Sequence, residues 1–127
     1  MSDGFTRRLI RDDGARTTDR GLSLQIRLPW YRALPVSTVE ISSSRLGVHA
    51  VALETIELEI NGNKLAACRL EDRIDDWWYV LDYATLHVAG AAARPGAHTI
   101  ELTVVLYPPY IPGLKWVTTS SKSVMVA

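Results

Sequence analysis

The chain has 127 residues, of which 47% are hydrophobic and 22% charged, the balance of an ordinary globular domain. Fourteen basic and fourteen acidic residues cancel, so the chain lacks the positive field that draws proteins to nucleic acid or anionic membranes. We therefore expect one domain over residues 1–127, with no nucleic-acid or membrane partner. A net charge of zero also favours self-association.

The beginning of the sequence is polar, and we expect residues 1–18 to form a mobile arm or an edge strand. No apolar run follows Arg7 and Arg8, which predicts that no secretory signal is present and that the protein is cytoplasmic. The only cysteine, Cys68, excludes an internal disulfide and fits a reducing compartment. Its neighbours match no nucleophile motif, so we expect a small buried hydrophobic side chain.

The first half of the chain contains two segments with the period of a half-buried strand. Residues 22–28 alternate apolar and polar side chains, and residues 55–60 repeat the pattern. The second segment ends at Asn61-Gly62, a pair that tolerates the positive φ angles of a type I′ hairpin turn. The return strand is expected over residues 64–70. Residues 43–54 fit either a helical turn or a strand.

An aromatic strand is expected next, over residues 77–81. Trp77, Tyr79 and Leu81 would share one face of it, whereas Trp78 would lie on the other. Such a strand is apolar on both sides. One face can enter a core, and the other then needs a second cover.

The remaining strands complete the predicted architecture. A short strand is expected over residues 85–89, and a longer one over residues 98–107 begins at the Pro95-Gly96 turn. Residues 115–126 are rich in Val, Thr and Ser and predict one or two closing strands. Short antiparallel strands joined by turns predict two packed sheets. The fold class is therefore an all-β antiparallel β-sandwich, Ig-like or jelly-roll-like.

Two proline-bracketed loops, residues 28–35 and 107–113, present large side chains on a stiff backbone. Trp, Tyr and Arg are the residue types enriched among interface anchors. Together with the aromatic strand, these loops predict a partner-binding surface. Its candidate residues are Trp30, Tyr31, Arg32, Trp77, Trp78, Tyr110, Ile111 and Pro112. The alternative is that the aromatic rings only close the ends of the sandwich.

No group of residues predicts a self-sufficient active site. His49, His87 and His98 are scattered without metal-ligand spacing, and the acidic residues 71–76 lack the pattern of a calcium loop. Asp82 is expected to cap a turn through its carboxylate. A phosphate-binding glycine loop and a nucleophile elbow are both missing from the sequence. We predict no catalytic residue and no metal or cofactor site in this chain.

Four blocks of the sequence resemble the small (beta) subunits of bacterial C-glycoside deglycosidases. They are Arg-Leu-Pro-Trp-Tyr-Arg-Ala-Leu-Pro at 27–35, Trp-Trp-Tyr-Val-Leu-Asp at 77–82 with Ala-Thr-Leu at 84–86, Gly-Ala-His-Thr-Ile-Glu-Leu at 96–102, and Pro-Tyr-Ile-Pro-Gly at 109–113. In order, they cover most of residues 20–114. The first and last blocks are fairly specific, and the block at Gly96 is a general β-sandwich signal.

The resemblance implies a hetero-oligomeric lyase for C-glycoside catabolism whose catalytic alpha subunit is a TIM barrel holding a divalent metal such as manganese. The implied substrates are 3-oxo-C-glucosides of flavonoids and related aromatics, held mainly by that subunit. A ketone at sugar C3 acidifies the C2 proton, so a base can remove it while the metal holds the enolate oxygen. The aglycone carbon then leaves C1 by β-elimination. The present chain would dock on and stabilise the barrel, and would be inactive alone.

Two other functions remain open at this point. A stand-alone carbohydrate-binding sandwich would stack its exposed Trp and Tyr rings on sugars. A homo-oligomeric structural domain would cover the same rings with a second copy of the chain.

Overall fold

The computed structural model of the chain describes residues 8–11, 13–47, 49–89 and 95–127. Its strands are β1 (Arg16–Thr18), β2 (Gly21–Arg27), β3 (Leu34–Pro35), β4 (Val39–Leu46), β5 (His49–Ala50), β6 (Ile56–Ile60), β7 (Asn63–Ala66), β8 (Trp77–Trp78), β9 (Tyr83–Ala89), β10 (Gly96–Leu106) and β11 (Trp116–Val126). Three short 3₁₀ helices, η1 (Val36–Thr38), η2 (Leu53–Thr55) and η3 (Ala67–Asp72), lie between them.

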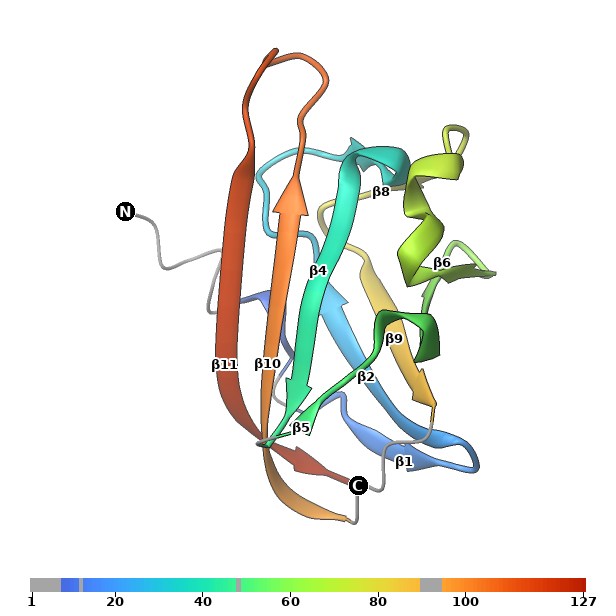
Figure 1. Cartoon of the computed structure of the whole chain (residues 1–127), viewed down its shortest axis with the longest axis vertical. Helices are drawn as coiled ribbons and strands as arrows, with labels where there is room; N and C mark the ends of the chain where they lie inside the picture. The colour runs from blue at the N-terminus through green and yellow to red at the C-terminus, as the bar shows by residue number, and fades with distance from the viewer. Residues whose placement is uncertain (1–7, 12, 48, 90–94) are drawn as a thin grey trace.

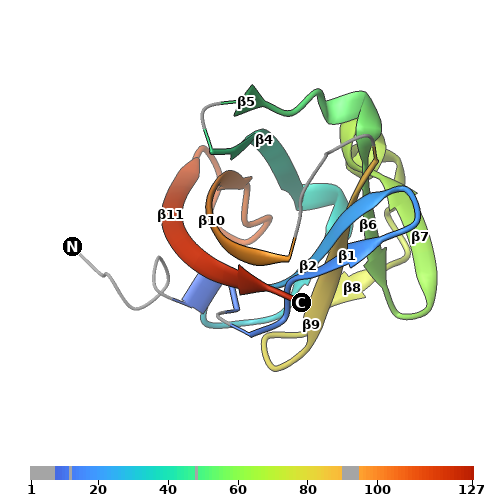
Figure 2. The same ribbon diagram turned by 90° about the horizontal axis from the view of Figure 1, so that it is seen from below.

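The strands form two antiparallel sheets and one short extra pair. The five-stranded sheet has the order β1-β2-β9-β6-β7, the four-stranded sheet has the order β11-β10-β4-β5, and β3 pairs with β8 (Figure 1). Seen from below, the two larger sheets face each other (Figure 2). The predicted antiparallel β-sandwich is therefore confirmed.

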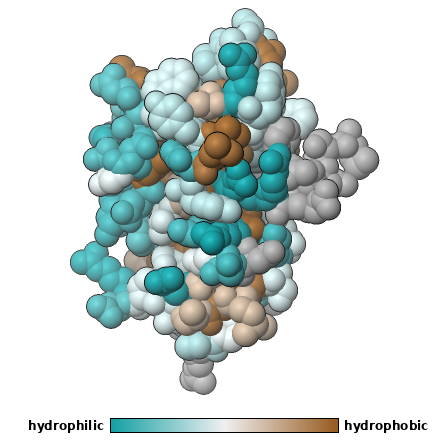
Figure 3. Space-filling view, turned by 180° about the vertical axis from the view of Figure 1, so that it is seen from behind, coloured by the Kyte–Doolittle hydropathy of each residue, from teal (hydrophilic) through white to brown (hydrophobic). Residues whose placement is uncertain are grey.

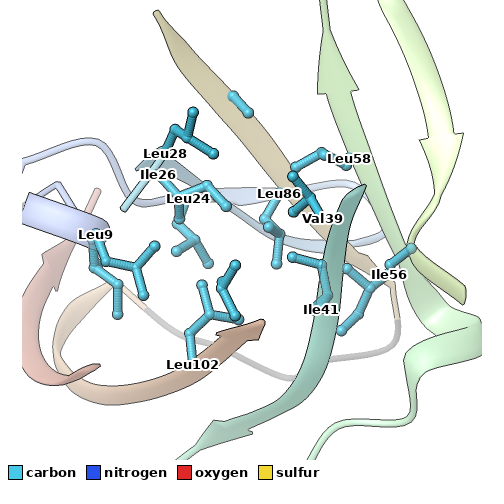
Figure 4. Packing of buried hydrophobic residues seen from close by; sticks show 14 of the residues in the cluster. Leu9, Leu24, Ile26, Leu28, Val39, Ile41, Ile56, Leu58, Leu86 and Leu102 are labelled. Atoms are coloured by element: carbon cyan, nitrogen blue, oxygen red, sulfur yellow. The ribbon is translucent and has the colours of Figure 1, made fainter. Parts of the chain in front are cut away.

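The core fills the space between the two sheets. Alternate residues of β2, β9 and β6 point inward from one side, and those of β4 and β10 from the other, as the period of a pleated strand requires. Figure 4 shows Leu24, Ile26 and Leu86 facing Ile41 and Leu102 across this space. All five are almost completely buried. None of the helices in the described part of the chain has the length and apolar character needed to cross a lipid bilayer.

The segments with clear period-two alternation are strands as predicted. They are β2, β6, β9 and β10, while the closing segment is the single strand β11. The hairpin turn between β6 and β7 is also confirmed, because Asn61 has a φ of 53° and Gly62 a φ of 81°. Those are the positive angles that a type I′ turn needs.

The strand β4 was not predicted before residue 43, because its alternation changes phase in the middle. Val39 and Ile41 point into the core, but the register against β10 shifts there, and Ser43 pairs with Thr103 while Ile41 pairs with Val104. This β-bulge moves the inward position to Ser44, a polar residue that is buried. The open segment 43–54 is thus the end of β4, the short β5 and most of η2.

The predicted return strand over residues 64–70 is wrong in its second half. β7 ends at Ala66, and the 3₁₀ helix η3 follows. Residues three apart share a face of a 3₁₀ helix, so Ala67 and Leu70 are buried. Cys68 falls between them and is exposed, which corrects the prediction of a buried cysteine.

The aromatic strand predicted over residues 77–81 is also much shorter than expected. Only Trp77 and Trp78 form β8, and a turn follows in which the backbone N–H of Asp82 donates to the carbonyl of Tyr79 at 2.9 Å. The exposure nevertheless alternates as predicted, because Trp78 is buried while its neighbours on the other face are open to solvent.

Part of residues 1–18, for which a mobile arm or an edge strand was expected, lies outside the described residues, namely 1–7 and 12. Of the rest, Leu9 and Ile10 are almost fully buried, and Ile10 forms an isolated bridge with Ile26 of β2. Residues 16–18 are the edge strand β1, which pairs with β2. Residues 9–10 and 16–18 therefore belong to the sandwich.

The burial of Leu9 leads to a stability prediction. Leu9→Ala leaves a cavity between the sheets and should lower the free energy of unfolding by about 2–5 kcal/mol, measured by urea denaturation. Ile74→Ala, at a side chain that is 71% exposed, is the control and should change it by less than about 0.5 kcal/mol. Equal effects of the two variants would show that the N-terminal segment is not anchored in the core.

Candidate partner-binding surface

The two proline-bracketed loops meet at one end of the sandwich, shown uppermost in Figure 1. Trp30 joins them, because its indole N–H donates a hydrogen bond to the Tyr110 hydroxyl. The Trp30 ring also packs edge-on against Trp116, with 5.5 Å between the ring centroids. Only 4% of Trp30 remains exposed. This residue therefore fastens the loops to each other.

The side chains around Trp30 stay open to solvent. Tyr31 is 57% exposed, and its ring lies 4.9 Å from that of Trp30. The guanidinium carbon of Arg32 lies 5.2 Å from the centroid of the Tyr110 ring, at a cation–π distance. Both loops thus hold aromatic and arginine side chains in fixed positions on the surface.

The strands β3 and β8 bring the aromatic segment to the same end of the sandwich. Leu34 pairs with Trp78, and Pro35 pairs with Trp77. Trp78 is fully buried, and its indole N–H donates to the carbonyl oxygen of Asp82 at 3.0 Å. Trp77 is 44% exposed. The turn predicted at Asp82 is present. The hydrogen bonds described for Asp82 are made by its backbone N–H and carbonyl, however, and not by the carboxylate that was expected to cap the turn.

These observations revise the predicted contact residues. Trp30 and Trp78 are buried within the chain, where they satisfy their indole N–H groups, and so neither has surface to offer a partner. Ile111 is half-buried, and Pro112 is exposed. The exposed residues are Tyr31, Arg32, Trp77, Tyr79, Leu81, Tyr110 and Pro112, and we call them the loop-end surface.

Tyr79 and Leu81 were not among the predicted contact residues, although the alternation over residues 77–81 marks both as outward-facing and both are exposed. They share the outward face with Trp77, and Leu81 is 77% exposed. From behind, brown apolar groups lie scattered among white and teal ones in both halves of the molecule (Figure 3). The interest of Tyr79 and Leu81 is that they lie next to Trp77 in the chain and are exposed like it.

Metal-ligating side chains do not converge in the described part of the chain. No three His, Cys, Asp or Glu side chains there are grouped so that they could hold a metal ion. His87 pairs with Glu59 at 2.7 Å across neighbouring strands. In the acidic segment 71–76, Arg73 pairs with Asp76 at 3.0 Å, and the segment is a largely exposed connection as expected.

One tyrosine near the loop end has an altered ionisation. The hydroxyl of Tyr107 donates a hydrogen bond to a carboxylate oxygen of Glu40 at 2.7 Å. This hydrogen bond raises the pKa of Tyr107 above its ordinary value of 10.0, because a phenolate could not donate it and would face the Glu40 charge. The pair joins β4 to the first residue after β10.

Comparison with known proteins identifies close relatives. The family model for the C-glycoside deglycosidase beta subunit matches residues 5–110. The 3'-dehydrocarminate deglycosidase beta subunit of a Microbacterium species is 36% identical over 108 residues, which are 85% of this chain and 82% of the relative. The C-glycoside deglycosidase beta subunit of Microbacterium trichothecenolyticum is 31% identical over 104 residues, covering 82% and 79%. A C-glycoside deglycosidase beta subunit of Arthrobacter globiformis is 35% identical over 62% of this chain and 60% of its own length.

The contact between Trp30 and Tyr110 can be tested by removing one hydroxyl. Tyr110→Phe keeps the ring beneath Arg32 but leaves the Trp30 N–H without its acceptor, and should lower the free energy of unfolding by about 1 kcal/mol. Tyr31→Phe, which removes a hydroxyl from an exposed tyrosine, should change it by less than about 0.5 kcal/mol. Urea denaturation followed by tryptophan fluorescence measures both. A larger loss in the Tyr31 variant would contradict the assignment.

The Tyr107–Glu40 pair predicts an alkaline titration. Ultraviolet absorbance should detect a tyrosine that ionises above the ordinary range, and Tyr107→Phe should remove that transition. Glu40→Ala should return it toward pH 10. Since the folded pKa is raised, the stabilisation from this group is complete below the ordinary phenol pKa and is lost as pH rises through the raised one. A transition unchanged by Glu40→Ala would rule out this cause.

Proposed function

Because the chain belongs to the C-glycoside deglycosidase beta subunit family, we propose that it is the accessory subunit that docks on and stabilises the catalytic subunit of that enzyme. The observation that carries the proposal is the loop-end surface. It offers fixed, exposed aromatic and arginine side chains, while no three His, Cys, Asp or Glu side chains of the described residues are grouped so that they could hold a metal ion. The isolated chain is then expected to be inactive.

The partner in this proposal is a TIM-barrel alpha subunit. The reaction of the complex is cleavage of the carbon–carbon bond between sugar and aglycone in 3-oxo-C-glucosides, including those of flavonoids. The ketone at C3 acidifies the proton on C2, and its removal by a base allows the aglycone carbon to leave C1 and take up a proton. That chemistry requires a positioned base, which we assign to the large subunit together with most of the substrate contacts.

A divalent metal such as manganese, if the complex uses one, does not fit this chain. Such ions prefer several oxygen or imidazole ligands converging on one point. No three described His, Cys, Asp or Glu side chains are grouped in this way, and His87 pairs with the single carboxylate of Glu59. We therefore assign the metal to the partner as well, and no step of the reaction to a residue of this chain.

The energetics of docking favour the loop-end surface. Proline brackets both loops, and Trp30 fixes them against each other, so little conformational freedom is left to lose on binding. Each buried Trp, Tyr or Arg anchor of an interface contributes about 2 kcal/mol or more. Trp77 and Tyr31 already combine a large ring with an ordered backbone, which makes them the strongest anchors of this surface.

The proposal predicts a loss of complex formation when the exposed rings are removed. Tyr31→Ala combined with Trp77→Ala should weaken binding to the large subunit by at least about 30-fold, measured by co-purification and by isothermal titration. Both side chains are exposed, so the variant should fold. The matched control is Met125→Ala with His49→Ala, two exposed residues at the other end of the sandwich. Equal binding by both variants would remove the loop-end surface from the interface.

The exposed rings also support a second candidate function, a carbohydrate-binding sandwich. Trp77 could stack on a sugar without any partner. Titration of the isolated chain with a C-glucoside, followed by tryptophan fluorescence, separates the two functions. Saturable binding by the chain alone, lost in the Trp77→Ala variant, would favour the carbohydrate-binding module.

A further inference from the structure

A basic hollow of about 440 Å³ lies beside the loop-end surface, between the two sheets. The N-terminal segment, the end of β2, the start of β9 and the middle of β11 form its walls. Its charged and aromatic lining residues are Arg8, Arg11, Asp13, Arg27, Tyr83 and Lys122. Among the described residues, the lining thus includes four basic side chains and one carboxylate.

The cationic groups of this hollow are held in place by their neighbours. The guanidinium carbons of Arg11 and Arg27 lie 4.8 Å and 5.5 Å from the centroid of the Tyr83 ring. Lys122 donates from Nζ to the carbonyl of Ile10 at 2.9 Å. Arginine that is stacked on a ring loses less freedom when it binds an acceptor. The donors are therefore largely prepositioned.

The contact between Asp13 and Arg11 shows how a carboxylate can bind to the arginines of the hollow. Its Oδ1 accepts from Nε of Arg11 at 2.7 Å, while Nη1 of the same guanidinium donates to the side-chain oxygen of Gln25. A guanidinium carries five N–H donors, and these two contacts engage two of them. Asp13 itself is 75% exposed, so it leaves the hollow open to a further acceptor.

The position of the hollow favours a protein carboxylate over a small free anion. Nη2 of Arg27 donates to the carbonyl of Val80 at 3.4 Å, which connects the hollow to the turn that carries Tyr79 and Leu81. A partner on the loop-end surface would therefore cover it. The walls are long, partly exposed side chains, and they exclude water from an anion only when a partner closes over them.

We propose that this hollow receives an acidic segment of the large subunit, bearing Asp or Glu side chains that pair with Arg11 and Arg27. The proposal rests on the proposed function, since it names the chemistry of that partner's contact. Charge pairs at the edge of an interface act mainly on the association rate and on its salt dependence. The two arginines should therefore speed association and orient the partner.

The test measures association of the full chain with the large subunit by stopped-flow fluorescence at increasing sodium chloride. Arg11→Glu with Arg27→Glu should slow association by about tenfold or more at low salt and remove most of the salt dependence. Arg20→Glu with Arg69→Glu makes the same charge change at exposed sites outside the hollow and should have a much smaller effect. Should the reversal variant not fold, Arg11→Gln with Arg27→Gln should give the same changes at reduced size.

The outcomes separate this inference from the proposed function. If the unaltered chain does not bind the large subunit, the proposed function fails and this inference with it. If the Tyr31 and Trp77 variant loses binding but the arginine variants associate like their control, this inference alone is overturned. Titration of the isolated chain with inorganic phosphate and with acetate tests whether the hollow binds a free anion. Saturable binding lost in the arginine variants, with subunit association unchanged, would assign the hollow to a free anion instead.

Discussion

The burial of Trp30 between two loops is the interaction on which the loop end of the molecule depends. Trp30 follows β2 in the five-stranded sheet, while its contacts Tyr110 and Trp116 flank the connection between β10 and β11 in the four-stranded sheet. One side chain therefore ties the two sheets together where their strands end. The ring enters the core while its neighbours Tyr31 and Arg32 remain outside on a backbone it has fixed. Rigid presentation of surface rings is thus a consequence of core packing.

The strands were predictable wherever one face of a strand is apolar and the other polar, as in β2 and β10. The sequence did not reveal which tryptophans are buried, because the indole has a large apolar body and a polar N–H. Trp30 and Trp78 are buried since acceptors are available inside, at Tyr110 and the Asp82 carbonyl. Those acceptors come from tertiary contacts and from a turn that alternation over residues 77–81 does not show. The local pattern marked exposed rings at the loop end, but it also included Trp30 and Trp78, which are core residues.

The basic hollow could not be predicted from the sequence for a different reason, which is that its lining residues are distant from one another in the sequence. Arg11, Arg27 and Lys122 come together only when the N-terminal segment seals the gap between β2 and β11. Leu9 and Ile10 close this gap. Their side chains are buried in the core, although their neighbours in the sequence are predominantly polar. The available signals are the apolar pair Leu9-Ile10 and Lys122, the single charged residue of the Thr- and Ser-rich strand β11. Neither signal specifies a charged site until the strand order is known.

The loop-end surface and the hollow would contribute to assembly in different ways. Aromatic contacts are short-ranged and govern how slowly a complex dissociates, but a flat ring tolerates several orientations. Charge pairs act over roughly 8–10 Å in physiological salt and discriminate between orientations, although each adds little net affinity when exposed. Arg27 joins the two regions through the Val80 carbonyl, next to the turn that carries Tyr79. In the accessory role proposed above, the chain would act through where and how firmly it docks on the catalytic subunit, and adjacent regions of these two kinds would determine both.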